Sequence, residues 1–459
     1  MKVRTASPAA LAALLIGVAL PASVHAETLE DALVTAYSTS PTIGAQRAQQ
    51  RATDESVSQA AAGWRPTVAF NGNYGRARQS HNTIPGFATP SLQYLNPNIE
   101  ELTVTQPVYL GGRIESQIQS AEALDKAGRA QLSSIEQQVL LQAVTAYMDV
   151  LLNAAIVELN RSNEEVLRKQ LEAAQDRFRV GELTRTDVAQ SEAALKGANA
   201  DRVAAEGNLV NSRTTYLRVI GKSPERLEQP KGVPELPPSE DVAIETSYKN
   251  NPDLQSANFT EESSRYDIDT AFGALLPTLS IEGDLIRAED QTTKELILKT
   301  AQVLAKVTVP LYQSGAEYAA VRQKKDIASQ RKLQIALTRD QVRQSVTQAW
   351  NALQTARAQI ISRREQVRAA EITLDGMIQQ AQVGTSTTLD VLSAEQVRLQ
   401  AQVGLVTAQH DEFVAAYTLK QAIGELTAQN LNLPVKQYDP TVHYKNVRDQ
   451  LIGTTPSGE

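Results

Sequence analysis

The sequence contains no cysteine. This absence excludes disulfide bonds, thiolate metal sites and a lipid-modified cysteine at the start of the mature chain. Aromatic residues make up only 5% of the chain, which argues against a large aromatic core and favours a wall of alanine- and glutamine-rich helices. The four histidines lie far apart in the sequence, so no histidine-based metal site and no cofactor is expected: His25, His81, His410 and His443.

Basic residues are outnumbered by acidic ones. The chain has 45 lysines and arginines against 52 aspartates and glutamates, a formal net charge of −7. Two of the basic residues belong to an N-terminal leader, which leaves 43 against 52, or −9, in the mature chain. A nucleic-acid partner is not expected at this charge.

That leader, residues 1–26, has the layout of a secretory signal peptide. Lys2 and Arg4 precede an apolar run at 9–20, and the tripeptide at 24–26 is a small-x-small cleavage site. The run is too short to cross a bilayer as a helix, so the mature chain is expected to begin near Glu27, beyond the inner membrane. No later stretch is expected to supply the ~20 apolar residues of a spanning helix, so any membrane span must be made of strands.

The chain is an internal duplication. The segment ALVTAYSTSPTIGA, from Ala32, matches AIETSYKNNPDLQS, from Ala243, at an offset of 211 residues. Farther along the offset is 203, and it pairs Gly112 with Gly315. The eight-residue difference falls between the strand-like segments of the first half, where an exposed loop is expected. Each half is therefore one structural unit, and a polar tail follows them: 27–232, 233–433 and 434–459.

Each half contains two segments that alternate apolar and polar residues, as β-strands do. A half-buried hairpin in a soluble sheet shows the same alternation, but spans near ~10 residues are those a membrane barrel needs. Trp64, Tyr109 and Tyr312 flank the segments and are predicted to form an aromatic belt at the periplasmic interface. The strands are expected at about 66–77, 102–110, 278–286 and 302–312.

A long helix is predicted after each strand pair. Residues 113–179 and 316–382 each span 67 positions without proline, and their apolar residues recur every three or four positions. At ~1.5 Å per residue each helix would be ~100 Å long, a length that requires support from neighbouring helices. Each then turns at a tip and returns: the tips are expected at 180–187 and 383–390, and the return helices end near 220 and 423.

Four strands in one chain cannot close a membrane barrel, and open edges in lipid leave unpaired backbone groups that cost several kcal/mol each. Two chains give eight strands, whose interior side chains fill, whereas three give twelve strands and a lumen. The expected fold is therefore mainly α with a small β part: a homotrimer whose 12-stranded transmembrane β-barrel continues into a long periplasmic α-helical barrel. Polar strand residues would line the lumen: Thr67, Asn71, Asn73, Ser280, Glu282 and Asp284.

Both tips carry capping signals. Glycine in Val180-Gly181 and Val383-Gly384 permits the left-handed end of a helix. Thr184–Asp187 and Thr387–Asp390 have the spacing of capping boxes, with an acid favourable at a helix N-terminus. Capping is the main energetic role predicted, and a capped hairpin tip also presents its turn to a partner.

These features together resemble the TolC family of outer-membrane factors. The resemblance rests on the duplication, the two-strand insert in each half, the YLGGR and YQSGA junctions and the VG-x-x-T-x-x-DV tips, and it covers about Leu29 to Gly424. Without a lipid-accepting cysteine, the chain resembles the non-lipidated branch. The resemblance implies a channel-tunnel in the outer membrane of a Gram-negative bacterium, with a periplasmic extension. It also implies docking to a periplasmic adaptor (membrane fusion) protein and an inner-membrane ABC or RND-type transporter, for drug efflux or type I protein secretion.

The resemblance also implies a gate at the periplasmic mouth, held in the family by acidic rings and polar links between helices. Asp390 matches the first aspartate of the ring, but the second is replaced by Ser393. Ser386 stands in place of the family's tip arginine, Ala381 in place of its linking tyrosine, and Thr186-Asp187 is kept. The predicted gate residues therefore form only part of the family's closing network, and Val180, Gly181, Val383 and Gly384 are predicted to dock the adaptor.

Two other functions are weighed against the channel. The second hypothesis is a periplasmic coiled-coil adaptor or scaffold with soluble sheets and no pore. An enzyme ranks third, because the chain shows no nucleophile–base or metal constellation. The polar tail after Leu433, which ends in TTPSGE, is expected to be partly disordered.

Overall fold

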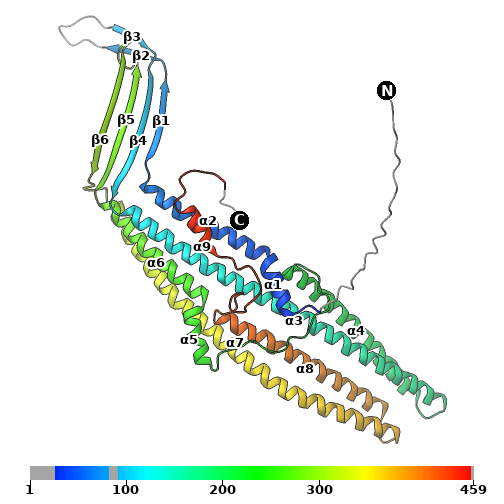
Figure 1. The fold of residues 1–459 in the computed structure, drawn as a ribbon. Coiled ribbons are helices and arrows are strands. Elements are labelled where there is room, and N and C mark those ends of the chain that lie inside the picture. The colour runs from blue at the N-terminus through cyan, green and yellow to red at the C-terminus, as the bar shows by residue number, and fades with distance from the viewer. Residues whose placement is uncertain (1–25, 82–90, 456–459) are drawn as a thin grey trace, which may run out of the picture.

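The computed structural model describes residues 26–81 and 91–455. It shows an elongated, mainly helical chain with a β-sheet at one end and two helical hairpins at the other (Figure 1). The leader predicted for residues 1–26 lies outside the described residues, apart from Ala26.

Each repeat opens with a short helix followed by a longer one. Ser40 caps the longer helix of the first repeat and Asn251 caps that of the second, and in both a proline follows at the first helical position, where its missing N–H is harmless. The four helices are α1 (Leu29–Thr39), α2 (Pro41–Ala61), α5 (Glu240–Asn250) and α6 (Pro252–Phe272), and short 3-10 turns η1 (Ala62–Trp64) and η2 (Gly273–Leu275) end the longer pair.

A four-stranded antiparallel sheet joins the two repeats in the order β1-β4-β5-β6. Its strands differ from the expected bounds: β4 begins at Asn98, whereas β6 ends at Thr308, before Pro310 and Tyr312. Proline cannot donate to a strand ladder, which accounts for the earlier end. The strands are β1 (Thr67–Tyr74), β4 (Asn98–Leu110), β5 (Thr278–Glu289) and β6 (Ile297–Thr308).

The first repeat also carries a small antiparallel pair that the sequence analysis does not assign. Strands β2 (Ala77–His81) and β3 (Ser91–Leu95) pair with each other beyond the far end of the sheet (Figure 1). Their sequences, ARQSH and SLQYL, lack the regular apolar alternation by which strands are detected.

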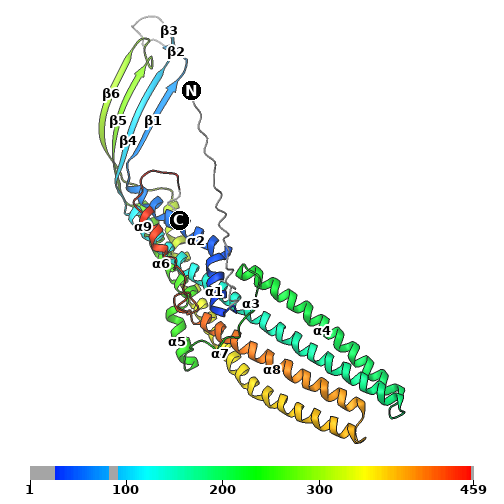
Figure 2. The same cartoon turned by 45° about the vertical axis from the view of Figure 1, so that its right-hand side comes forward.

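Two 67-residue helices run along the molecule over the residues expected, α3 (Arg113–Arg179) and α7 (Ala316–Gln382). Near the sheet, α2 and α6 pack beside them; in the other half, α4 (Arg185–Ile220) and α8 (Thr388–Ala422) take those places. The hairpins α3–α4 and α7–α8 touch mainly through α3 and α8, so α4 and α7 lie at the outer edges of the layer (Figure 2).

The main core lies halfway along the molecule, where α3 packs on α1 and α4. Leu140, Val144 and Tyr147 of α3 are fully buried there with Tyr216 and Ile220 of α4. This packing corrects the expectation that no later stretch could match a spanning helix, because α3 contains an 18-residue window with a mean hydropathy of 1.6. Apolar residues of this part of α3 pack into the core instead.

Most of the tail predicted to be partly disordered is folded, and residues 456–459 of it lie outside the described residues. Residues 434–455, here called the strap, fold back along α2 and include helix α9 (Pro440–Val447) (Figure 1). The backbone N–H of Tyr438 donates to the Tyr37 hydroxyl at 3.2 Å, and His443 Nδ1 lies 2.8 Å from Asp54 Oδ2. Partners hundreds of residues away hold the strap, which leaves no local signal in its polar sequence.

Candidate functional site: the sheet and the hairpin tips

One face of the sheet is apolar and uncovered over its central rows. The strand register places alternate side chains of all four strands in common rows across this face. Phe70 and Val303 there are 68% and 77% exposed. A continuous exposed apolar face marks contact with a membrane or a partner rather than water. The two central rows are Phe70–Leu102–Leu285–Ala301 and Val68–Val104–Gly283–Val303.

The opposite face carries the residues predicted to line a lumen. The register places the β1 and β5 sets on this one side, since Thr67 is joined through Thr105 to Glu282, and Ala69 through Thr103 to Asp284. Asp284 Oδ2 accepts a hydrogen bond from Gln302 Nε2 of β6 at 2.9 Å. Over these central rows the sheet therefore has one apolar and one polar face, whereas the next row on the apolar side, toward the far end of the sheet, carries Glu100, Arg287 and Lys299.

Both edges of this sheet are open. Strands β1 and β6 each pair on one side only in the part of the chain that the structure describes. An edge strand presents a row of unpaired N–H and C=O groups, which lipid cannot satisfy. The sheet needs further strands if its apolar face meets lipid.

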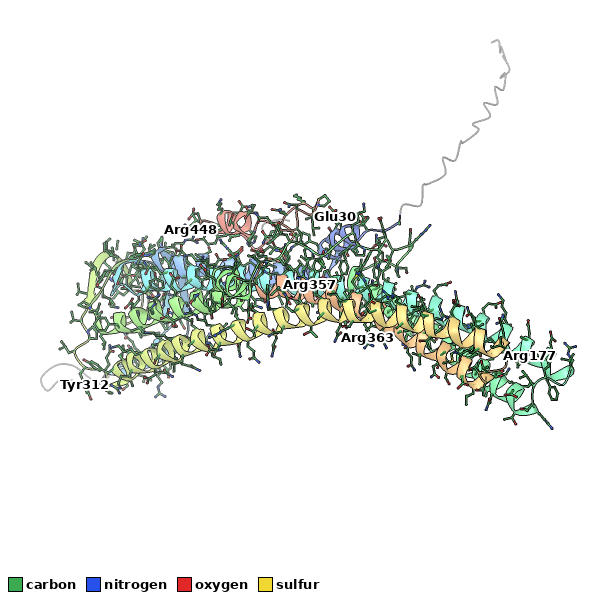
Figure 3. The ribbon with its side chains drawn as sticks, turned by 90° about the horizontal axis from the view of Figure 1, so that it is seen from below. Glu30, Arg177, Tyr312, Arg357, Arg363 and Arg448 are labelled. Atoms are coloured by element: carbon green, nitrogen blue, oxygen red, sulfur yellow. The ribbon has the colours of Figure 1, made fainter. Side chains whose placement is uncertain are left out.

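The three predicted belt aromatics lie along the helix side of the sheet. Trp64 precedes β1, Tyr109 is the penultimate residue of β4, and Tyr312 follows β6. All three are exposed, Tyr312 by 79%, and Figure 3 shows Tyr312 at the opposite end of the long helices from Arg177. The Trp64 carbonyl accepts from Gln106 Nε2 at 2.9 Å, which fixes the entry into the sheet.

The first tip is a capped helical turn. Gly181 has a φ of 83°, and the N–H of Glu182 donates to the Arg177 carbonyl at 2.9 Å. Asp187 Oδ2 then accepts from the N–H of Thr184 at 2.9 Å and from its hydroxyl at 2.6 Å, so the pair forms a capping box. These hydrogen bonds hold the pKa of Asp187 below its ordinary value.

The second tip repeats this geometry. Gly384 has a φ of 77°, and Asp390 Oδ2 accepts from the N–H and hydroxyl of Thr387 at 2.9 and 2.6 Å. Those bonds lower the pKa of Asp390, and the Ser386 hydroxyl adds a contact at 3.2 Å. Both caps present an exposed valine, Val180 or Val383, at the end of the molecule.

The gate residues remain divided between the two tips. Among the described residues, no hydrogen bond joins 180–187 to 383–390, and Thr186 and Ser393 are exposed. The tips end separate hairpins, as Figure 2 shows. Their assignment to a gate therefore stays a prediction.

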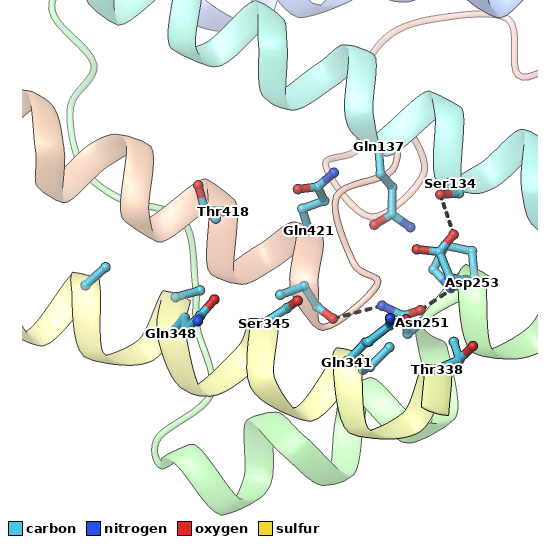
Figure 4. Close-up of a pocket in the computed structure, with 15 residues that line it drawn as sticks. Ser134, Gln137, Asn251, Asp253, Thr338, Gln341, Ser345, Gln348, Thr418 and Gln421 are labelled. Atoms are coloured by element: carbon cyan, nitrogen blue, oxygen red, sulfur yellow. Dashed lines mark hydrogen bonds between the residues drawn. The ribbon is translucent and has the colours of Figure 1, made fainter. Parts of the chain in front are cut away.

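A polar cavity interrupts the wall between the long helices. It has a volume of about 620 Å³ and lies where α8 ends and α6 begins, beside α3 and α7 (Figure 4). Asn251 Nδ2 donates to the Ala422 carbonyl at 3.1 Å, and Ser134 donates to Asp253 at 2.7 Å. The first bond joins the end of α8 to the start of α6, and the second joins α3 to the start of α6.

Comparisons with known proteins agree with this geometry. The family model "Outer membrane efflux protein" matches residues 32–222 and 243–425, one segment in each repeat. The chain is 34% identical over 456 residues to the outer membrane efflux protein BepC of Brucella suis, which covers 98% of this chain and 97% of that protein. It is 24% identical over 429 residues to the outer membrane protein TolC of Vibrio cholerae, covering 90% and 94%.

Solved structures show the same fold. The Campylobacter jejuni CmeC outer membrane channel superposes with a TM-score of 0.78 at 16% identity, over 92% of this chain and 89% of that one. A two-faced sheet carried on long helical hairpins defines the class of outer-membrane channel components. The chain belongs to the outer membrane efflux protein family.

Several expectations are thereby confirmed. The protein is an outer-membrane channel of the efflux and secretion class, mainly helical with a small strand part and internally duplicated, and its helices extend into the periplasm. These relatives are channel proteins rather than enzymes, and they lend no support to the poreless scaffold.

Proposed function

We propose that three copies of the chain close their sheets into one 12-stranded barrel that spans the outer membrane. The observation that carries this proposal is the two-faced sheet with both edges open. Pairing β1 of one copy with β6 of the next satisfies both edges, because each unpaired backbone group in lipid costs several kcal/mol. The apolar face then meets lipid and the polar face encloses a water-filled lumen.

The helices continue this barrel into the periplasm as a tube. Both outer helices of the layer expose apolar side chains along their length, which supports contact with neighbouring copies. The exposed residues are Val203 and Val210 on α4, and Leu333, Leu337, Ile361 and Ile372 on α7. Packing α7 of one copy beside α4 of the next buries these side chains and completes the wall.

The tube serves as a passive exit duct for drug efflux or type I protein secretion. A periplasmic adaptor docks at the tips, on Val180-Gly181 and Val383-Gly384, and links the duct to an inner-membrane ABC or RND-type transporter. Asp390 is the principal residue of the periplasmic gate, and Thr186, Asp187, Ser386 and Ser393 form the rest of it. Exposed valines on capped, rigid turns support the docking assignment, because such turns offer apolar contact at little conformational cost.

Planar-bilayer recording tests this function. Purified protein should be trimeric by cross-linking and should produce discrete ion conductance. A lipid-face variant, Leu285→Arg, should abolish assembly because it places a charge in the membrane. Its lumen-face neighbour, Asp284→Asn, should preserve assembly and change only ion selectivity. An inert, monomeric preparation of the unaltered protein would contradict the proposal.

A further inference from the structure

The strap ends in two strongly exposed aliphatic side chains. Leu451 is 73% exposed and Ile452 is 89% exposed, although Gln450 before them and Gly453 after them are polar or small. Exposure of an adjacent aliphatic pair to water is unfavourable. The surroundings of the pair therefore indicate what it contacts.

The pair is held at the base of the sheet. Arg65, two residues before β1, donates from Nη1 to the Gln450 carbonyl at 2.8 Å. The segment after α9 curves toward the base of β1 in both Figure 1 and Figure 2. Because Trp64 of the aromatic belt adjoins Arg65, the pair lies beside the place where the proposed barrel leaves the membrane.

The local backbone keeps the pair away from the core. Gln450 Nε2 donates to the Ile452 carbonyl at 3.3 Å, and Gly453 has a φ of 129°, which other residues rarely adopt. A cavity of about 610 Å³ separates this turn from α2. The α2 side of the cavity is lined by small, polar and charged residues and offers no large apolar side chain to cover the pair: Ala48, Arg51, Ala52, Glu55, Ser58 and Gln59.

We infer that Leu451 and Ile452 insert into the phospholipid leaflet that faces the periplasm and form a second anchor beside Trp64. The inference rests on the proposed barrel. A phospholipid interface fits the pair because it is continuous with the aromatic belt and accepts aliphatic side chains. Arg65 beside the pair can place its remaining N–H donors at headgroup level.

Depth-dependent fluorescence quenching tests the inference on the full chain. Trp64→Phe and Trp350→Phe remove both natural tryptophans, and Ile452→Trp then supplies a single probe. In phosphatidylcholine vesicles with brominated chains, the emission of this probe should fall at least about twofold relative to unbrominated vesicles. The matched control is Val442→Trp, an exposed position on α9 next to His443, whose partner Asp54 lies roughly 15 Å from Trp64 along α2. The control should show no quenching.

Two outcomes would overturn the inference. The first is a probe at position 452 that is quenched no more than the control at 442. The second is a blue-shifted emission without bromine quenching, which would assign the pair to a neighbouring copy of the chain. Protein that retains Trp64 as its single tryptophan is measured in parallel. If Trp64 is quenched and position 452 is not, the anchor fails and the barrel stands; if neither is quenched, the proposed placement of the sheet fails as well.

Discussion

The two hairpins come from one duplicated sequence, yet they are held together differently. In the first hairpin, ionic hydrogen bonds cross from α3 to α4: Arg202 Nε donates to Glu164 at 2.5 Å, and Arg161 lies 2.9 Å from Glu206. Asn199 of α4 also donates to Glu164, at 3.2 Å. These hydrogen bonds lower the pKa of Glu164, so it stays charged as the centre of the network.

The second hairpin has weaker links between its helices. Arg357 and Glu412 are 3.4 Å apart, and Gln402 donates to Glu371 at the same distance. Its buried acid, Glu395, pairs with Arg398 of the same helix.

This difference shows what the duplication has kept and what it has not. Both hairpins retain the length, the capped tip and the apolar periodicity, which depend on local sequence. Bonds between the helices depend on pairs of residues distant in sequence, and these have diverged. A pair within one helix does not resist separation of two helices, so we expect the α7–α8 hairpin to be the more easily deformed.

The largest difference expected between the repeats is in how much the buried aromatic residue of each core contributes to the free energy of unfolding. Tyr147 is fully buried and donates to the carbonyls of Glu27 and Glu228, whereas its counterpart Trp350 is only partly buried. Tyr147→Ala should lower the free energy of unfolding by about 4 kcal/mol, and Trp350→Ala by about half as much. Denaturant unfolding in detergent, followed by circular dichroism, measures both.

Tyr147→Phe serves as the control for the packing part of this effect. It keeps the ring and loses only the hydroxyl bonds, so the expected loss is about 1–2 kcal/mol. Equal losses for the two alanine variants would show that the repeats have cores of equal strength.

A second matched pair tests the buried acid. Glu395 is 1% exposed and ion-paired, whereas Glu192, at the corresponding position of the first repeat, is exposed. Glu395→Gln should cost about 2 kcal/mol because Arg398 is left without its charge partner in a mostly buried site. Glu192→Gln should change stability by less than about 0.5 kcal/mol. The melting temperatures of the two variants are measured in parallel. Equal shifts would contradict this contrast.

The third contrast is a pH dependence confined to the first repeat. Burial, followed by a hydrogen bond with Asp54, raises the pKa of Asp125 to about 7, while Gln50, Arg129 and His443 complete the cluster under the strap. Since the folded-state pKa lies above the unfolded value of 3.8, this stabilisation is complete below pH 3.8 and is lost as the pH rises through about 7. Hydrogen exchange in α9 should therefore accelerate between about pH 4 and 7 beyond its intrinsic increase, with no further excess above about pH 7.

Two comparisons sharpen this prediction. Asp125→Asn should remove the extra acceleration, because an amide stays neutral. The matching positions of the second repeat are Arg265 and Ala328, so α6 should show no such change. An identical pH response in α6 and α9 would contradict the assignment to this cluster.

The sequence predicts the periodic parts of the molecule well and the tertiary links poorly. Apolar spacing and the absence of proline predict the ranges of α3 and α7, and alternation predicts the two faces of the sheet. The strap and the Asp54–Asp125–His443 cluster have no local signal, because their partners are up to 401 residues apart. Divergence between the repeats could have indicated them: Asp54 and Asp125 are positions at which the second half carries unrelated residues.

The smallest contrast separates the two tips, and it decides whether Asp390 is more than a helix cap. Asp187→Asn and Asp390→Asn remove one charge each from the same capping geometry, and both acids are charged at neutral pH because their hydrogen bonds to threonine lower the pKa. The two variants should therefore lose similar, small amounts of helix stability. If the Asp390 side chains of three copies surround the lumen, only Asp390→Asn should weaken block by hexamminecobalt added from the periplasmic side. The expected change in planar-bilayer recordings is several-fold. Equal block in both variants and the unaltered protein would leave Asp390 with capping as its role.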